Sequence, residues 1–224
     1  MVAMFWKKKT TQGKNDPATH VLQKGEKIVA VDDDHIYTIA NIITKEQRQW
    51  LDASTLWFEQ GKPVFMHYHQ EGLLEKRNDP EWENQAIFFW YANEQFPKKS
   101  LPPFFESFKT HYFTFKKTDL GDISLIGGQV IPWFDQPGGG YKHYCEKDGQ
   151  KLTIAELFQM NLIEFLEIVE PPKITYQMLQ DRDNFYFLEP DSLDFIEGWP
   201  AINEKVVPVS LVYEVGLCKL VRRI

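Results

Sequence analysis

Residues 127–140 read Gly-Gly-Gln-Val-Ile-Pro-Trp-Phe-Asp-Gln-Pro-Gly-Gly-Gly, and this stretch predicts more about the chain than any other. A short apolar strand ends at Pro132, two aromatic residues and then Gln136 follow, and Pro137 leads into the glycines. Glycine reaches positive φ and lets the backbone approach another group without a Cβ in the way. Proline fixes φ where such a turn begins. The stretch therefore predicts a rigid corner that presents Gln136 between aromatic side chains.

The composition of the 224-residue chain predicts a folded protein with a substantial core. Hydrophobic residues make up 43% and charged residues 25%, which is enough to bury a substantial core. The high aromatic content of 15% suits a β-rich core or a site that stacks on a ring. The net charge of -7 argues against a partner made of duplex nucleic acid, because such binders carry a basic surplus.

Two further features predict a soluble protein, and a third argues against a disulfide-rich one. No apolar run approaches the length of about 18 residues that a transmembrane helix needs. At the N-terminus, apolar residues precede Lys7, the reverse of a Sec signal peptide, so we expect a cytoplasmic protein or one exported by a non-Sec route. The two cysteines, Cys145 and Cys218, are too few for a disulfide scaffold.

Capping residues and hydrophobic spacing predict the main elements. Thr44 and Gln47 form a capping box that begins a helix to about Gln60, and Thr153 and Glu156 form another that begins a helix to about Glu167. Helical turns are expected from 100 to 108 and after 191. Strands are expected at 27–30, 35–43, 64–69, 87–91, 111–117, 123–131, 173–178 and within 206–221.

The order of Ser100-Leu-Pro-Pro, His111, the corner and the helix that follows resembles the tuberculosis necrotizing toxin family. Members are NAD(P)+ glycohydrolases, usually the C-terminal toxic domains of larger secreted bacterial proteins. The resemblance covers roughly residues 77–170, and its core at 128–140 is specific. It implies a compact β-rich α+β domain that hydrolyses the nicotinamide–ribose bond. NAD+ or NADP+ would be the substrate, with no bound cofactor, and an immunity protein would be a partner.

The resemblance also implies roles for individual residues. The catalytic glutamine falls on Gln136 and the catalytic histidine on His111. Lys99 stands where the family has an arginine before Ser-Leu-Pro-Pro, and lysine keeps the charge but loses the bidentate fork for phosphate. Arg77 and Tyr91 are the nearest counterparts of the family's upstream arginine and aromatic residue.

Four residues of the corner are expected to bind the same substrate. Trp133 and Phe134 would stack on nicotinamide or the sugar, and Gly138 and Gly139 would offer backbone N–H groups to the pyrophosphate or ribose. No metal site is expected. The pair His67 and His69 would be only half of one, since no matching ligand cluster follows in the sequence.

The predicted organisation is a flexible arm at 1–19, an N-terminal α/β extension at 20–76, the glycohydrolase-like domain at 77–170 and a C-terminal β-rich extension at 171–224. A second interpretation stays open, that of a catalytically inactive relative that binds a partner. The family's Arg-Phe-Gly has no counterpart in this chain, and both extensions exceed what a toxin domain needs.

Overall fold

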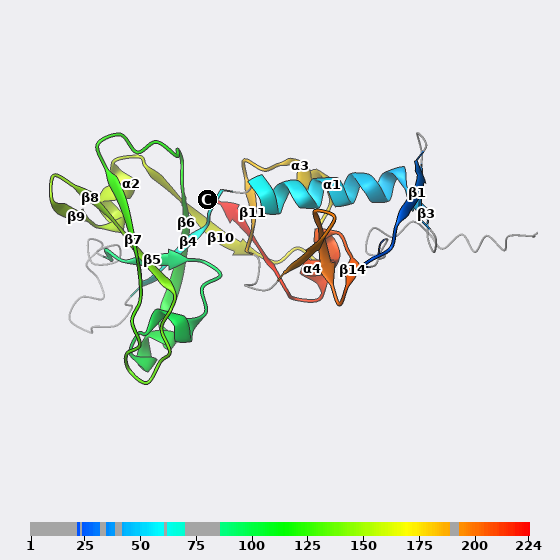
Figure 1. Cartoon of the computed structure of the whole chain (residues 1–224). Helices are drawn as coiled ribbons and strands as arrows, with labels where there is room; N and C mark the ends of the chain where they lie inside the picture. Colours follow the sequence, from blue (N-terminus) through cyan, green and yellow to red (C-terminus); the bar gives the residue numbers. More distant parts are fainter. Residues whose placement is uncertain are drawn as a thin grey trace, which may run out of the picture. The chain divides into compact units, whose positions relative to one another are not determined.

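The computed structural model describes residues 22, 24–31, 35–38, 42–60, 62–69, 86–188 and 193–224. The chain divides into two compact units (Figure 1). The first comprises residues 1–55 with 193–215, and the second comprises 56–192 with 216–224. Each unit therefore consists of two separate stretches of the sequence, which alternate with those of the other unit. The predicted domain boundaries at 20, 77 and 171 stay a prediction.

The first unit is built around the N-terminal part of helix α1, Lys45–Gln60. The capping box predicted for it is present, because Gln47 N donates to Thr44 Oγ1 at 3.2 Å and Thr44 N donates to Gln47 Oε1 at 3.0 Å. The buried Ser54 hydroxyl accepts from Val209 N at 2.9 Å, which ties α1 to helix α4. The other elements are β1 (Ile28–Val31), β2 (His35–Thr38), β3 (Ile42–Thr44), β12 (Asp194–Ile196), β13 (Trp199–Ile202), β14 (Lys205–Val206) and α4 (Val209–Glu214).

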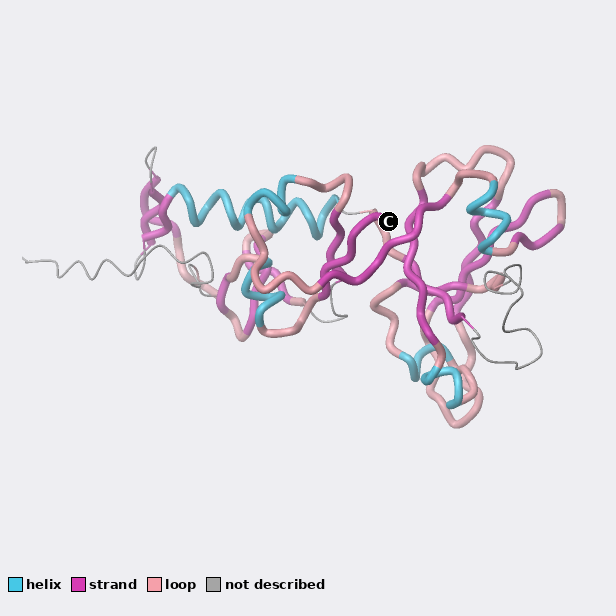
Figure 2. Tube along the Cα trace, turned by 180° about the vertical axis from the view of Figure 1, so that it is seen from behind, coloured by secondary structure: helices cyan, strands magenta, loops and turns pink. Residues whose placement is uncertain are grey.

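The second unit is one antiparallel sheet in the order β11-β15-β10-β6-β4-β5-β8-β7, with β9 paired to β8 (Figures 1 and 2). Strands from both sides of residue 171 share it. The strands are β4 (Phe65–His69), β5 (Phe89–Tyr91), β6 (Lys109–Phe115), β7 (Ser124–Gln129), β8 (Tyr141–Lys147), β9 (Gln150–Leu152), β10 (Ile163–Val169), β11 (Phe185–Leu188) and β15 (Lys219–Arg223). The helices are the 3-10 turns η1 (Phe96–Lys99) and η2 (Pro103–Ser107) and the α-helices α2 (Ile154–Gln159) and α3 (Tyr176–Gln180).

The core of the second unit lies on one face of this sheet. Phe65, Phe89 and Phe113 come from neighbouring strands and are almost fully buried. Their rings meet edge-on or stacked at 5.2 to 5.7 Å between centroids, the spacing that aromatic pairs prefer. Ile154 and Leu157 of α2 pack against the same cluster. The β-rich α+β fold class that the resemblance implies is confirmed.

The helix predicted from Thr153 to about Glu167 is wrong in its length. Its capping box is present, but α2 ends at Gln159, and Asn161 adopts a φ of 58°. Residues 163–169 then form β10, a central strand of the sheet. The apolar and β-branched residues of 163–169 bury well between two strands, and this tertiary pairing overrides the helical spacing that continues from α2.

Two predictions for the C-terminal part are also wrong, and a third is right only at its ends. Residues 173–178 are not a strand, because the Thr175 hydroxyl caps α3 and accepts from Met178 N at 3.3 Å. The segment after 191 contains β12 in place of a helical turn. The run within 206–221 is strand only at its ends, in β14 and β15, and α4 lies between them. Short apolar segments do not by themselves separate helix from strand. Among the described residues, no helix is both long and apolar enough to cross a membrane.

Candidate functional site

The corner closes the hairpin between β7 and β8. Val130 N donates to Gly140 O, and Gly139 N donates to Val130 O, both at 2.8 Å, so the ladder extends beyond the two strands. At the tip, Gln136 N donates to Trp133 O at 2.9 Å. The two residues between them, Phe134 and Asp135, have φ values of 51° and 59°. Left-handed backbone costs a non-glycine residue roughly 1–2 kcal/mol. The tip is therefore a strained turn that the surrounding hydrogen bonds hold in place.

This strained turn displays an aromatic pair and an amide. The Trp133 and Phe134 rings stack at 5.3 Å with 11° between their planes, and Trp133 is 64% exposed. In the described part of the chain, the side-chain amide of Gln136 has no hydrogen-bond partner. An amide carries both a donor and an acceptor, so this side chain is available to bind a ligand.

The glycines of the corner hold it against η1. Gly138 N donates to Pro97 O at 3.4 Å, and Gly140 N donates to Lys98 O at 3.0 Å. Gly138 has a φ of 66°, and a Cβ there would lie 2.7 Å from Val130 O. The N–H groups of Gly138 and Gly139 are thus already bonded within the protein. A ligand would instead meet the open side of Gly139, where a Cβ would have no neighbour within 4 Å.

Lys99, the last residue of η1, turns away into the interior. It is only 5% exposed, and its Nζ donates to the Tyr68 hydroxyl at 3.2 Å. Burial, reinforced by Tyr112 and Glu106, raises the pKa of Tyr68 to about 12. Trp90, Phe96 and Phe105 surround the Tyr68 ring. The predicted phosphate ligand is therefore held against an aromatic cluster.

Tyr91 lies at the end of β5, and beside it lies a histidine that the sequence did not single out. The Tyr91 ring stacks on Phe65 at 5.2 Å and meets His143 edge-on at 4.8 Å. Burial lowers the pKa of His143, an effect that the Phe89 backbone and Glu94 partly oppose. A Cβ on Gly127 would lie 3.0 Å from the His143 ring. A glycine inside a strand indicates such a close approach, so Gly127 is the sequence signal from which a packed side chain at this point could be predicted.

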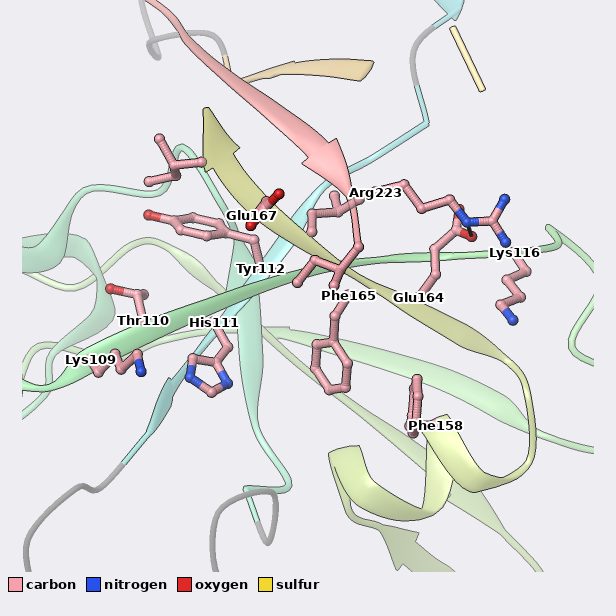
Figure 3. Close-up of a pocket in the computed structure, with 13 residues that line it drawn as sticks. Lys109, Thr110, His111, Tyr112, Lys116, Phe158, Glu164, Phe165, Glu167 and Arg223 are labelled. Atoms are coloured by element: carbon pink, nitrogen blue, oxygen red, sulfur yellow. Dashed lines mark ion pairs between the residues drawn. The ribbon is translucent and has the colours of Figure 1, made fainter. Parts of the chain in front are cut away.

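His111 lines a cleft of about 700 Å³ where β10 diverges from β6 (Figure 3). Its ring centroid lies 5.4 Å from that of His67 and 6.4 Å from that of Phe165. The buried carboxylate of Glu164 accepts from Arg223 Nε at 2.9 Å and from the Tyr186 hydroxyl at 3.3 Å. Burial, followed by Glu164, raises the pKa of Tyr186 to about 12. None of the residues that line this cleft belongs to the corner.

The register of β4 shows how the predicted site residues are distributed. Phe65 lies opposite Tyr91, and His67 lies opposite His111, so Tyr91 and His111 point to the same face of the sheet. Side chains alternate along a strand, so Tyr68 and the ammonium of Lys99 lie on the other face. The structure thus brings together the corner, η1 and the end of β5, and it places His111 in the separate cleft.

Two further predictions concern a second phosphate ligand and a metal site. Arg77, the expected upstream phosphate ligand, lies outside the described residues. Within the described ranges, no three His, Cys, Asp or Glu side chains are placed to hold a metal ion together.

Comparisons with known proteins give a structural similarity. No family model matches the chain, and no curated protein matches it. A solved structure titled "Atomic structure of tuberculosis necrotizing toxin (TNT) complexed with its immunity factor IFT" is similar with a TM-score of 0.37 and 13% identity. The similarity covers 60% of this chain and 56% of the length of that one.

Proposed function

We propose that the protein is an NAD(P)+ glycohydrolase that releases nicotinamide and leaves ADP-ribose or its 2′-phosphate. The observation that supports this most is Gln136, whose amide has no partner in the described part of the chain and stands in a strained turn beside an exposed aromatic pair. The corner that carries it has the sequence resembling that of the toxin family. Backbone strain of this kind gathers at binding and catalytic sites.

The chemistry needs the groups that the corner displays. Cleavage of the nicotinamide–ribose bond passes through an oxocarbenium-like state. The leaving nicotinamide departs neutral, so no general acid is required. The Gln136 carbonyl would accept from a ribose hydroxyl or orient the attacking water, and its NH2 group would donate. Trp133 and Phe134 would stack on the pyridinium, whose positive charge an aromatic face attracts.

The remaining predicted residues have defined parts in this proposal. Tyr91 would contact the ribose from the end of β5, and the surface at Gly138 and Gly139 would adjoin the substrate. Lys99 would reach a phosphate only after leaving the Tyr68 hydroxyl, and Arg77 would supply a second cation. His111 would act from the cleft, so its substitution tests whether cleft and corner serve one reaction.

The first prediction is that purified protein releases nicotinamide from NAD+ or NADP+ and that Gln136→Ala lowers kcat by about a hundredfold or more. The readout is nicotinamide measured by chromatography. Gln150→Ala, at an exposed position in β9, is the matched control and should retain full activity. Absence of turnover with both dinucleotides in the wild type, and also in Lys99→Arg, would contradict the enzyme proposal.

A non-catalytic binding protein is the second candidate function, and one observation favours it. Lys99 is buried, and its ammonium donates to the Tyr68 hydroxyl and lies over the Tyr68 ring. In that case the exposed aromatic tip would bind a partner, and growth of cells that express the protein would be indifferent to Gln136→Ala. Growth inhibition relieved by Gln136→Ala would instead support a toxin, for which an immunity protein would be the expected partner.

A further inference from the structure

Glu94 lies between β5 and η1, and its backbone is fixed because Glu94 N donates to Tyr91 O at 3.0 Å. Its side chain turns toward the corner, where Glu94 Oε2 accepts from Tyr141 N at 3.1 Å. Tyr141 is the first residue of β8 and directly follows the glycines. A hydrogen bond from a backbone N–H to a carboxylate is stronger than one between neutral groups.

The last glycine of the corner, Gly140, lies so close to this carboxylate that there is no room for a side chain. A Cβ on Gly140 would lie 2.8 Å from the Glu94 carboxyl carbon and 3.0 Å from Oε2. The same Cβ would lie 2.8 Å from Lys98 O, which accepts from Gly140 N. Only glycine lets the backbone come so close. The negative charge of Glu94 also acts on the pKa of His143: burial lowers this pKa, and Glu94 partly opposes the lowering.

Three hydrogen bonds therefore join residues 94–98 to residues 138–141. Two of them join backbone atoms, from Gly138 N to Pro97 O and from Gly140 N to Lys98 O. The third is the one from Tyr141 N to the Glu94 carboxylate, and it alone depends on a side chain. Pro137 connects this clamped end to Gln136 with a fixed φ.

We infer that Glu94 is a positioning residue, whose carboxylate fixes the glycine end of the corner and thereby the place of the Gln136 amide. The effect on catalysis rests on the proposed glycohydrolase function, whereas the effect on the corner does not. Loss of the acceptor would remove the third bond, and the exposed Tyr141 N–H would pair with water instead of with residue 94. Gln136 would then occupy its productive position for a smaller fraction of the time.

The test compares three variants of the full chain. Glu94→Gln keeps an acceptor oxygen at the same distance, Glu94→Ala removes it, and Glu94→Asp keeps the charge on a side chain one methylene too short. Glu146→Ala, on the same strand β8, is the control. Amide hydrogen exchange over residues 133–141 is measured by mass spectrometry, together with kcat and KM for NAD+.

We expect exchange over 133–141 to be about tenfold faster in Glu94→Ala and Glu94→Asp, only slightly faster in Glu94→Gln, where a weaker neutral bond replaces the charged one, and unchanged in Glu146→Ala. The value of kcat should fall by about tenfold or more in the same two variants, with a smaller change in KM. If Glu94→Ala fails to fold, Glu94→Asp decides. Unchanged exchange in the shortened variants would overturn the inference, as would a loss of kcat in Glu94→Gln equal to that in Glu94→Ala. An inactive wild type would refute the glycohydrolase proposal, and the exchange data would still decide the inference.

Discussion

Each of the three consecutive glycines of the corner has a different structural surrounding. Gly138 has a positive φ and faces the backbone of 130–132, Gly139 has a positive φ and open space, and Gly140 makes room for Glu94 and Lys98 O. The sequence predicts a corner in which glycine allows close approach, and the structure has one. The group that approaches Gly140, however, belongs to the protein. A run of glycines indicates close contact without indicating with what.

At this scale we predict a difference between two neighbouring substitutions. Gly138→Ala and Gly139→Ala both place a Cβ at positive φ, which costs roughly 1–2 kcal/mol. Only Gly138→Ala also brings a Cβ against backbone atoms, at 2.7 Å from Val130 O, and backbone cannot move aside cheaply. Chemical denaturation should show Gly138→Ala to be the less stable by about 1 kcal/mol or more. Equal losses from the two variants would mean that the corner relaxes around the new methyl group.

The environments that sequence reasoning did not anticipate are made by partners far away in the chain. Lys99 is predicted to be a phosphate ligand from its place before Ser-Leu-Pro-Pro, but its ammonium meets Tyr68, which lies 31 positions earlier. His143 carries no motif of its own, and its environment comes from Tyr91, Phe89 and Gly127 on neighbouring strands. Such environments follow from strand order, which a local pattern does not contain.

Among the elements, both ends of α1 are predicted correctly, whereas for α2 only the start is. The capping boxes at Thr44 and Thr153 are both present, because each consists of hydrogen bonds between residues three positions apart. The end of α2 depends on β10, whose pairing with β6 and β15 involves residues about 50 positions away on either side. The local signal therefore fixes where the helix begins, and the sheet decides where it stops.

For α2 we predict that Thr153→Ala costs about 1 kcal/mol in the free energy of unfolding, because it removes the hydroxyl that accepts from Glu156 N. The helix has only six residues, so little else holds its first turn. Thermal denaturation measures the effect, with Thr118→Ala in the loop after β6 as the control. A loss no larger than in Thr118→Ala would show that packing of Ile154 and Leu157 alone maintains the helix.

Across the whole molecule, several acidic groups are buried in their neutral form. Burial raises the pKa of Tyr68 and Tyr186 to about 12, and that of the Cys145 thiol to about 12. Tyr68 lies on β4, Tyr186 on β11 and Cys145 on β8, so the neutral groups are spread over the sheet. The fold is thus expected to be sensitive to alkali in a way that its composition does not reveal.

We predict that stability falls as the pH rises from 10 to 12. An unfolded tyrosine loses its proton near pH 10, whereas Tyr186 keeps its proton until about pH 12, so the unfolded state binds fewer protons in that interval. The stabilisation is complete below pH 10 and is lost as the pH passes through 12. After allowance for solvent screening, it amounts to roughly 1 kcal/mol.

The variant Tyr186→Phe has no phenolic proton to lose. It should therefore be less stable at neutral pH, because Glu164 loses a donor, and should depend less steeply on pH above 10. Urea denaturation at several pH values measures both effects, and an equally shallow dependence in the exposed control Tyr141→Phe would contradict the assignment to Tyr186.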